Sequence, residues 1–195
     1  MRKYGKMKEK EQDKKLRRRE YDESWKHVLE KYLWEFLEFY FPKRLEHIDK
    51  SKGYKFLDQE LDKIMAESEA KKRRVDKLVE VYTKKEPIWV LIHIEVQTYP
   101  EEEFPKRMFT YYYRIFERFK KPLASLAILA DQSPTFRPST YTIEALGRKY
   151  IHYEFEIFKL LDLKTKEEEL KKDPNIFAIV SLAHIKSWEK DYNSR

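Results

Sequence analysis

The stretch from Ile88 to Gln97, IWVLIHIEVQ, is almost continuously apolar until its last residues, and it decides the fold. A run of this length, rich in branched residues, is typical of a buried central strand. Because side chains alternate between the two faces of a strand, one face carries His93, Glu95 and Gln97 while the other is apolar. Burying an acid and an amide without partners is costly. This end of the strand is therefore either open to solvent or functional.

Other segments are assigned from the spacing of their apolar residues. Steps of three and four predict helices over residues 22–41, 104–119 and 166–188, with Asp22 as the first N-cap and Pro42 as the first stop. Alternation and β-branching predict strands over residues 75–81, 123–130, 140–145 and 149–160, the last two turning at Gly147. Residues 54–66 fit either a short helix or a strand. This order predicts an α/β fold in which a central mixed β-sheet is flanked by helices.

The composition limits the classes of protein to which the chain can belong. The chain of 195 residues is 41% hydrophobic and 39% charged, which fits one soluble domain with a densely ionic surface. It has no cysteine, which excludes disulfides, thiolate nucleophiles and cysteine-based metal sites. No apolar run is long enough for a membrane span, so no membrane is expected among its partners. A reducing cytoplasm is the expected compartment.

The positive charge is concentrated at the N-terminus. Residues 1–20 hold ten Lys and Arg against four acids, which gives +6 of the formal net charge of +7. One interpretation is a solvated, flexible lead segment. The other is a basic arm, including Arg17, Arg18 and Arg19, that adds salt-sensitive contacts to the phosphates of DNA. Residues 21–195 would then form the folded domain.

Two carboxylates can be expected to meet in the sheet. Asp76 lies in the strand predicted over residues 75–81, and Glu95 lies near the end of the next strand. If these strands are neighbours, the two side chains can share a divalent cation. Hard oxygen ligands favour Mg²⁺ or Mn²⁺. The alternative is that both acids lie at an exposed end of the sheet and meet only solvent.

The context of these two acids is more specific than the pair itself. The segments FLDQEL, RRVDKLVEVY, LIHIEVQ and FPKRMFTYYYRI follow one another in that order, after the opening segment YDESWKHVLEKYLWEFLEFYFP. Together they resemble the PD-(D/E)XK family of transposase-associated proteins, which is related to the recombination-promoting nucleases. The resemblance covers about residues 21–190.

The resemblance implies a restriction-endonuclease-like core and a Mg²⁺-dependent DNA endonuclease linked to mobile elements or recombination. In that family an Asp and a Glu on adjacent strands bind the metal, which activates water against a phosphodiester. By motif these residues are Asp76 and Glu95. The backbone carbonyl of Val96 would add a ligand, and Glu60 would approach a second metal position.

The chain departs from the general family pattern at Gln97. That position usually holds a lysine, which orients the attacking water and offsets charge on the phosphate. Glutamine can orient water but brings no charge. The metal would have to supply more of the stabilisation, and a slow or conditional nuclease is expected. On the same face, His93 is expected to pack behind the ligands rather than to act as a base.

Three arginines of the helix over residues 104–119 share one face, at steps of seven and four: Arg107, Arg114 and Arg118. Such a stripe is commonly solvated, but after this strand it could contact the DNA backbone.

Two rival interpretations remain open. The chain could be a catalytically silent relative that binds DNA or a protein through the same scaffold, or an interaction protein that self-associates, for example as a homodimer. The resembled proteins continue beyond the helix that ends near residue 188, which would make this chain a truncated copy.

Overall fold

A mixed five-stranded sheet forms the centre of the protein. The structure is a computed structural model, and it describes residues 24–66 and 75–193. The strands are ordered β1-β2-β3-β4-β7, with bounds Tyr54–Phe56, Val75–Tyr82, Trp89–Gln97, Leu123–Leu129 and Glu156–Lys159. The first three are antiparallel neighbours, whereas β4 runs parallel to both β3 and β7. This is the predicted α/β fold with a central mixed sheet, and it agrees with a restriction-endonuclease-like core.

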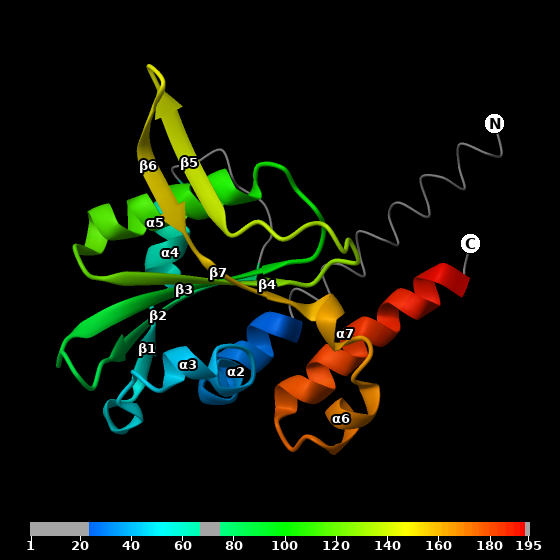
Figure 1. The fold of residues 1–195 in the computed structure, drawn as a ribbon. Coiled ribbons are helices and arrows are strands. Elements are labelled where there is room, and N and C mark those ends of the chain that lie inside the picture. Colours follow the sequence, from blue (N-terminus) through cyan, green and yellow to red (C-terminus); the bar gives the residue numbers. More distant parts are fainter. Residues whose placement is uncertain (1–23, 67–74, 194–195) are drawn as a thin grey trace.

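Helices cover both faces of the sheet (Figure 1). On one face lie the helical residues 24–31, then α2 (Leu33–Tyr40), α3 (Pro42–Leu45), α6 (Glu167–Lys172) and α7 (Ile176–Asn193). The other face is covered by α4 (Asp58–Ala66) and α5 (Phe104–Phe119). Short 3₁₀ turns occupy Lys50–Lys52 and Leu160–Leu163. Among the helices described, none is both long and apolar enough to cross a membrane.

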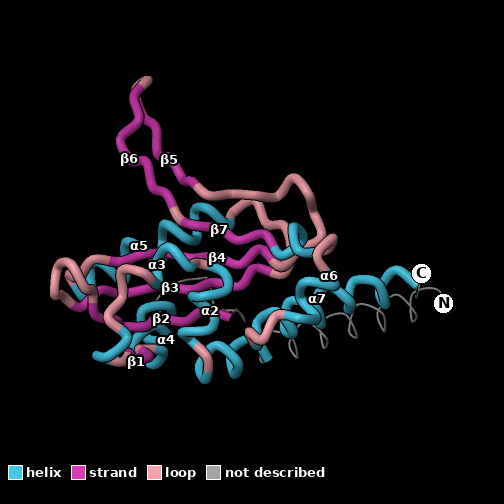
Figure 2. The backbone as a smooth tube through the Cα atoms, turned by 60° about the horizontal axis from the view of Figure 1, so that its bottom comes forward, coloured by secondary structure: helices cyan, strands magenta, loops and turns pink. Residues whose placement is uncertain are grey.

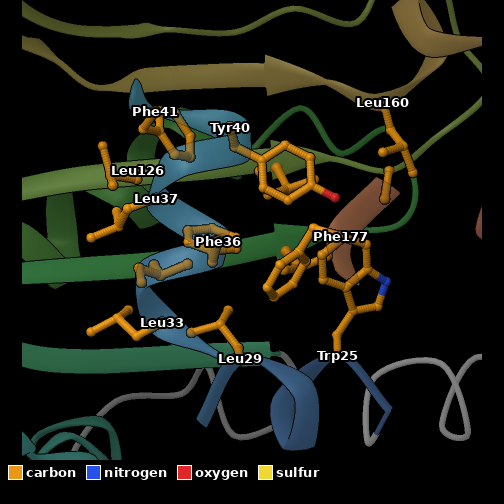
Figure 3. Close-up of a cluster of buried hydrophobic side chains, with 14 of the residues drawn as sticks. Trp25, Leu29, Leu33, Phe36, Leu37, Tyr40, Phe41, Leu126, Leu160 and Phe177 are labelled. Carbon is orange, nitrogen blue, oxygen red and sulfur yellow. The ribbon is translucent and has the colours of Figure 1, made fainter. Parts of the chain in front are cut away.

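The larger hydrophobic core lies between the sheet and α2 (Figure 3). Trp25, Phe36 and Phe177 are fully buried there, and their rings pack with that of Tyr40. The Tyr40 hydroxyl forms a 2.7 Å hydrogen bond with the hydroxyl of Ser181 on α7, so the ring keeps a polar partner inside the core. The apolar face of β3 packs against this core, as its alternation predicts.

The opposite face of β3 lies under α5. Leu91 and Leu78 pack there against Tyr111 and Ile115 of the helix. The stripe of α5 that faces the sheet recurs every three or four residues, which explains why this helix spans 104–119 as predicted. The polar residues of β3 therefore lie between the sheet and a helix.

A separate hairpin projects from the body. It consists of β5 (Thr140–Ala145) and β6 (Arg148–Glu154), which pair only with each other among the described strands. Figures 1 and 2 both show it standing away from the main sheet. The strand predicted over residues 149–160 is thus wrong as one element. At Phe155, whose N–H donates to the carbonyl of Ser139, the chain leaves the hairpin and joins β4 as β7.

The first and last predicted helices are each divided. Tyr32 leaves helical geometry, although the Tyr32 N–H still donates to Val28 and the Phe36 N–H to Tyr32. Pro42 starts α3 instead of only ending a helix, since proline is well tolerated at a first helical position. Pro174 separates α6 from α7, because the residue before a proline is forced into an extended conformation, as Asp173 is here. Asp22 lies outside the described residues.

The ambiguous segment over residues 54–66 contains both elements. Residues 54–56 pair with β2 as the edge strand β1, and α4 follows from Asp58. Lys77 of β2 binds Glu30 and Asp58, the latter at 2.5 Å, and so ties the first helical segment and α4 to the sheet.

Candidate metal centre

The two carboxylates meet as the sequence predicted. Asp76 on β2 lies directly opposite Glu95 on the antiparallel strand β3. Ligand atoms of Asp76, Glu95 and His93 all lie within 4.8 Å of one another, a spacing that could accommodate a metal ion. Glu95 is fully buried, whereas Asp76 is half-buried. The register of β2 against β3 and the alternation of side chains along each strand together place these groups on the face of the sheet that α5 covers.

His93 is the third member of the group. Its ring is fully buried and stands edge-on to the ring of Tyr111, with 5.1 Å between the centroids. Its Nε2 is 4.0 Å from Oε2 of Glu95, and neither ring nitrogen has a hydrogen-bond partner within the described part of the chain. Burial lowers the pKa of His93 to about 4, despite the opposing charge of Glu95. The imidazole is therefore neutral at physiological pH, the form that binds metals.

Arg107 reaches into the site from α5. Its Nη2 donates to Oε1 of Glu95 at 2.9 Å and to Oε1 of Gln97 at 2.7 Å, and its Nη1 donates to Glu101. The guanidinium also lies over the ring of Phe104, 4.9 Å from its centroid. Burial alone would lower the pKa of Arg107, but the negative charges of Glu95 and Glu101 outweigh it and raise that pKa above its ordinary value.

Gln97 is held in the same network. Its Nε2 donates to the carbonyl of Tyr99 at 2.6 Å and to Oε2 of Glu101 at 3.3 Å, while its Oε1 accepts from Arg107. Only 1% of the residue is exposed. The position is thus enclosed, but by polar groups rather than by apolar side chains.

Three carboxylates belong to this cluster, those of Asp76, Glu95 and Glu101, and Arg107 binds the last two. The donor set also fits a metal, since carboxylate oxygens bind Mg²⁺ and Mn²⁺ and a neutral imidazole favours the transition metal of the two.

The three predicted arginines do not share one exposed face, so that prediction is wrong. Arg107 is buried in the site, the half-buried Arg114 donates to the carbonyl of Ile64 at 3.1 Å, and only Arg118 is exposed. Each lies at the margin of the stripe that α5 presents to the sheet, so the neighbouring element decides its environment. For Arg107 that element is β3, and for Arg114 it is α4.

The Val96 side chain belongs to the core on the opposite face of β3, and its carbonyl lies in the strand between Glu95 and Gln97. Glu60 is half-buried on α4 and is not among the grouped ligands of the described chain. The basic-arm residues Arg17, Arg18 and Arg19 lie outside the described residues.

Sequence reasoning missed the partners of the two acids. His93 was expected to pack behind the ligands, and Glu101 had no expected role. A signal for Arg107 was present: it precedes Tyr111 by one helical turn on the margin of an apolar stripe, where a charged side chain needs a buried partner. Comparisons of the chain with models of known protein families, with curated proteins and with solved structures found no match.

Proposed function

We propose that this protein is a metal-dependent phosphodiester hydrolase that cuts DNA, a nuclease of the PD-(D/E)XK type. The observation that carries the proposal is the placement of Asp76 opposite Glu95 on adjacent strands, with ligand atoms no more than 4.8 Å apart. Two carboxylates this close repel each other, and a shared cation removes that repulsion. The oxygen donors of Asp76 and Glu95, with a ring nitrogen of His93 beside them, support a divalent cation.

Asp76 and Glu95 would hold Mg²⁺ or Mn²⁺, and His93 offers a nitrogen ligand that favours Mn²⁺. When bound, the cation would activate water and stabilise charge on the phosphate. Asp76 is the least buried of the three, so a phosphate would approach from its side of the group. DNA is the proposed substrate because two acids joined by a divalent cation suit a phosphodiester.

Arg107 would supply the positive charge that Gln97 lacks. Its guanidinium bonds both Glu95 and Gln97, so a fixed cation stands beside the position at which the resembled nucleases carry lysine. Gln97, held by Arg107 and by the Tyr99 carbonyl, orients its amide toward the same cluster. In this proposal Arg107 balances charge and Gln97 positions water.

The proposed setting is the cytoplasm, with mobile-element or recombination DNA as the target. The basic residues 1–20 would add phosphate contacts without sequence specificity. Arg118 is the arginine of α5 that remains exposed for such a contact.

Cleavage of plasmid DNA tests this function directly. The wild-type protein is expected to nick or cut the plasmid with Mn²⁺ or Mg²⁺ and to stop when EDTA is added. Asp76→Ala is expected to reduce the rate at least about tenfold, because one metal ligand is lost. Asp62→Ala, which changes an exposed acid of α4, is the matched control and should cleave like wild type. Equal cleavage by the wild type and Asp76→Ala would refute the proposal.

A catalytically silent binding module is the second candidate, and one observation favours it. Arg107 already gives Glu95 a buried ion pair at 2.9 Å, so this carboxylate has a positive partner in the protein itself. Metal binding to the wild type, lost in Asp76→Ala, without any cleavage would support this candidate. DNA binding without metal binding would support it as well.

Gln97→Lys tests the arrangement around the unusual glutamine. The substitution puts a second cation beside Arg107 and removes one of the two acceptors of its Nη2, so we expect a loss of about 1–3 kcal/mol in the free energy of unfolding. The double variant Gln97→Lys/Arg107→Gln exchanges the two side-chain types and should recover most of that loss. Urea denaturation followed by circular dichroism measures both. A fully stable Gln97→Lys would mean that the site rearranges around the lysine.

A further inference from the structure

Three buried polar side chains lie next to one another beside the candidate metal centre. Both ring nitrogens of His93 and the hydroxyls of Ser125 and Tyr153 are enclosed, and none of these atoms has a partner of hydrogen-bond geometry among the described residues. His93 is fully buried, and Ser125 and Tyr153 are each 7% exposed. Buried polar groups in folded proteins are nearly always paired, either with protein groups or with ordered water. Three such groups in one place therefore call for a common explanation.

These groups share one layer of the fold. In the parallel register of β3 and β4, His93 lies directly beside Ser125, so both side chains are on the face of the sheet that α5 covers. Tyr153 of β6 belongs to the same layer, in a cluster with Ala127 of β4 and Met108 of α5. Burial raises the pKa of Tyr153, and the Ser125 hydroxyl is near enough to lower it in part. The three polar groups are thus neighbours that stand slightly too far apart for direct hydrogen bonds.

One water molecule would satisfy all three groups. A direct hydrogen bond between any two of them would leave the third without a partner. A buried water typically makes about three hydrogen bonds to polar groups of this kind. The imidazole offers one N–H donor, and each hydroxyl can donate or accept, so a water between them has a suitable partner in every direction.

We infer that His93, Ser125 and Tyr153 hold one buried water, and that this water positions the His93 ring for the metal centre. The water accepts from the Nδ1–H of His93, which leaves the lone pair of Nε2 on the side of Glu95, whose Oε2 is 4.0 Å away. A metal-binding histidine is commonly held by such a bond from its other ring nitrogen. Ser125 and Tyr153 are then positioning residues. The positioning role rests on the proposed function, whereas the water site does not.

Nuclear magnetic resonance tests the water site in the metal-free protein. In the wild type we expect magnetisation transfer between a long-lived water and the ring protons of His93. Ser125→Val replaces the hydroxyl and fills the space beside it with methyl groups, so it should remove this signal. Ser181→Ala changes a buried serine that bonds the Tyr40 hydroxyl in the other core, and this control should keep the signal. Absence of the signal in the wild type would overturn the inference, whether or not the protein binds metal.

Manganese binding tests the positioning role. Titration with Mn²⁺, followed by electron paramagnetic resonance, gives the dissociation constant without any cleavage. Ser125→Ala is expected to weaken binding about tenfold, as loss of a group that orients a metal ligand usually does. Ser125→Thr keeps a hydroxyl and should bind like wild type, and so should the control Ser181→Ala. Equal affinities of Ser125→Ala and Ser181→Ala would overturn the positioning role alone, whereas a wild type that binds no Mn²⁺ would overturn it together with the proposed function.

Discussion

Arg107→Met is expected to lower the free energy of unfolding by about 3–5 kcal/mol, because it leaves the fully buried Glu95 carboxylate without its cation. Methionine keeps most of the side-chain volume, so the loss reflects charge and hydrogen bonding rather than a cavity. The guanidinium also binds Gln97 and Glu101, and those bonds are lost with it. Urea denaturation of the wild type and the variant measures the difference.

The double variant Arg107→Met/Glu95→Gln is the control for this interpretation. It removes both charges of the pair, so it should recover at least about half of the stability that Arg107→Met loses. A loss under about 1 kcal/mol for Arg107→Met would mean that water reaches Glu95, because only exposed ion pairs are that weak.

The same variant tests whether a divalent cation binds at Glu95. If a divalent cation binds Glu95, Mn²⁺ should raise the melting temperature of Arg107→Met more than that of the wild type, because the metal then replaces the missing partner. Asp76→Ala in the same background should abolish the shift. An equal shift in wild type and Arg107→Met would place the bound cation away from Glu95.

Asp131→Ala is expected to destabilise the fold by a similar amount, about 3–5 kcal/mol. Asp131 follows β4 and accepts from Lys159 of β7 at 2.7 Å, and both side chains are 1% exposed. Lys159 also donates to the carbonyl of Phe136 at 3.1 Å, so the pair ties the segment before the hairpin to the edge strand. Removal of the acid leaves a buried ammonium group without its counter-charge.

An exposed ion pair in the same region provides the matched control. Arg137 binds Asp162 through two hydrogen bonds, but these side chains are 41% and 55% exposed. Asp162→Ala should therefore cost no more than about 1 kcal/mol in the same denaturation experiment. The double variant Asp131→Ala/Lys159→Met should recover part of the larger loss. Equal costs for Asp131→Ala and Asp162→Ala would show that burial does not set the strength of these pairs.

The sequence predicted best those helices and strands whose apolar pattern reflects packing against one neighbouring element. Residues 104–119 form one helix because a single apolar stripe faces the sheet throughout. Residues 89–97 form a buried strand because apolar side chains occupy most of its positions on both faces. Asp76 meets Glu95 because their two strands, joined by a short connection, are antiparallel neighbours.

The elements that were missed depend on contacts between distant parts of the chain. Residues 149–160 have one continuous strand pattern, yet β5 pairs with the first part and β4 with the second. The inward position of Arg107 depends on Glu95 of β3 and on Glu101, which no helical period can reveal. Alternation placed His93 on the correct face, but its 5.1 Å contact with the Tyr111 ring required the packing of α5.

The alternation along β3 restricts how this protein can change over evolution. Successive side chains of that strand serve the hydrophobic core and the candidate metal centre in turn. Substitutions can alter one function while sparing the other. An insertion or deletion of one residue early in the strand would exchange the two faces beyond it, turning Glu95 into the core and Ile94 toward Asp76. Length variation should therefore be confined to the connections at residues 83–88 and 98–103, which border the strand.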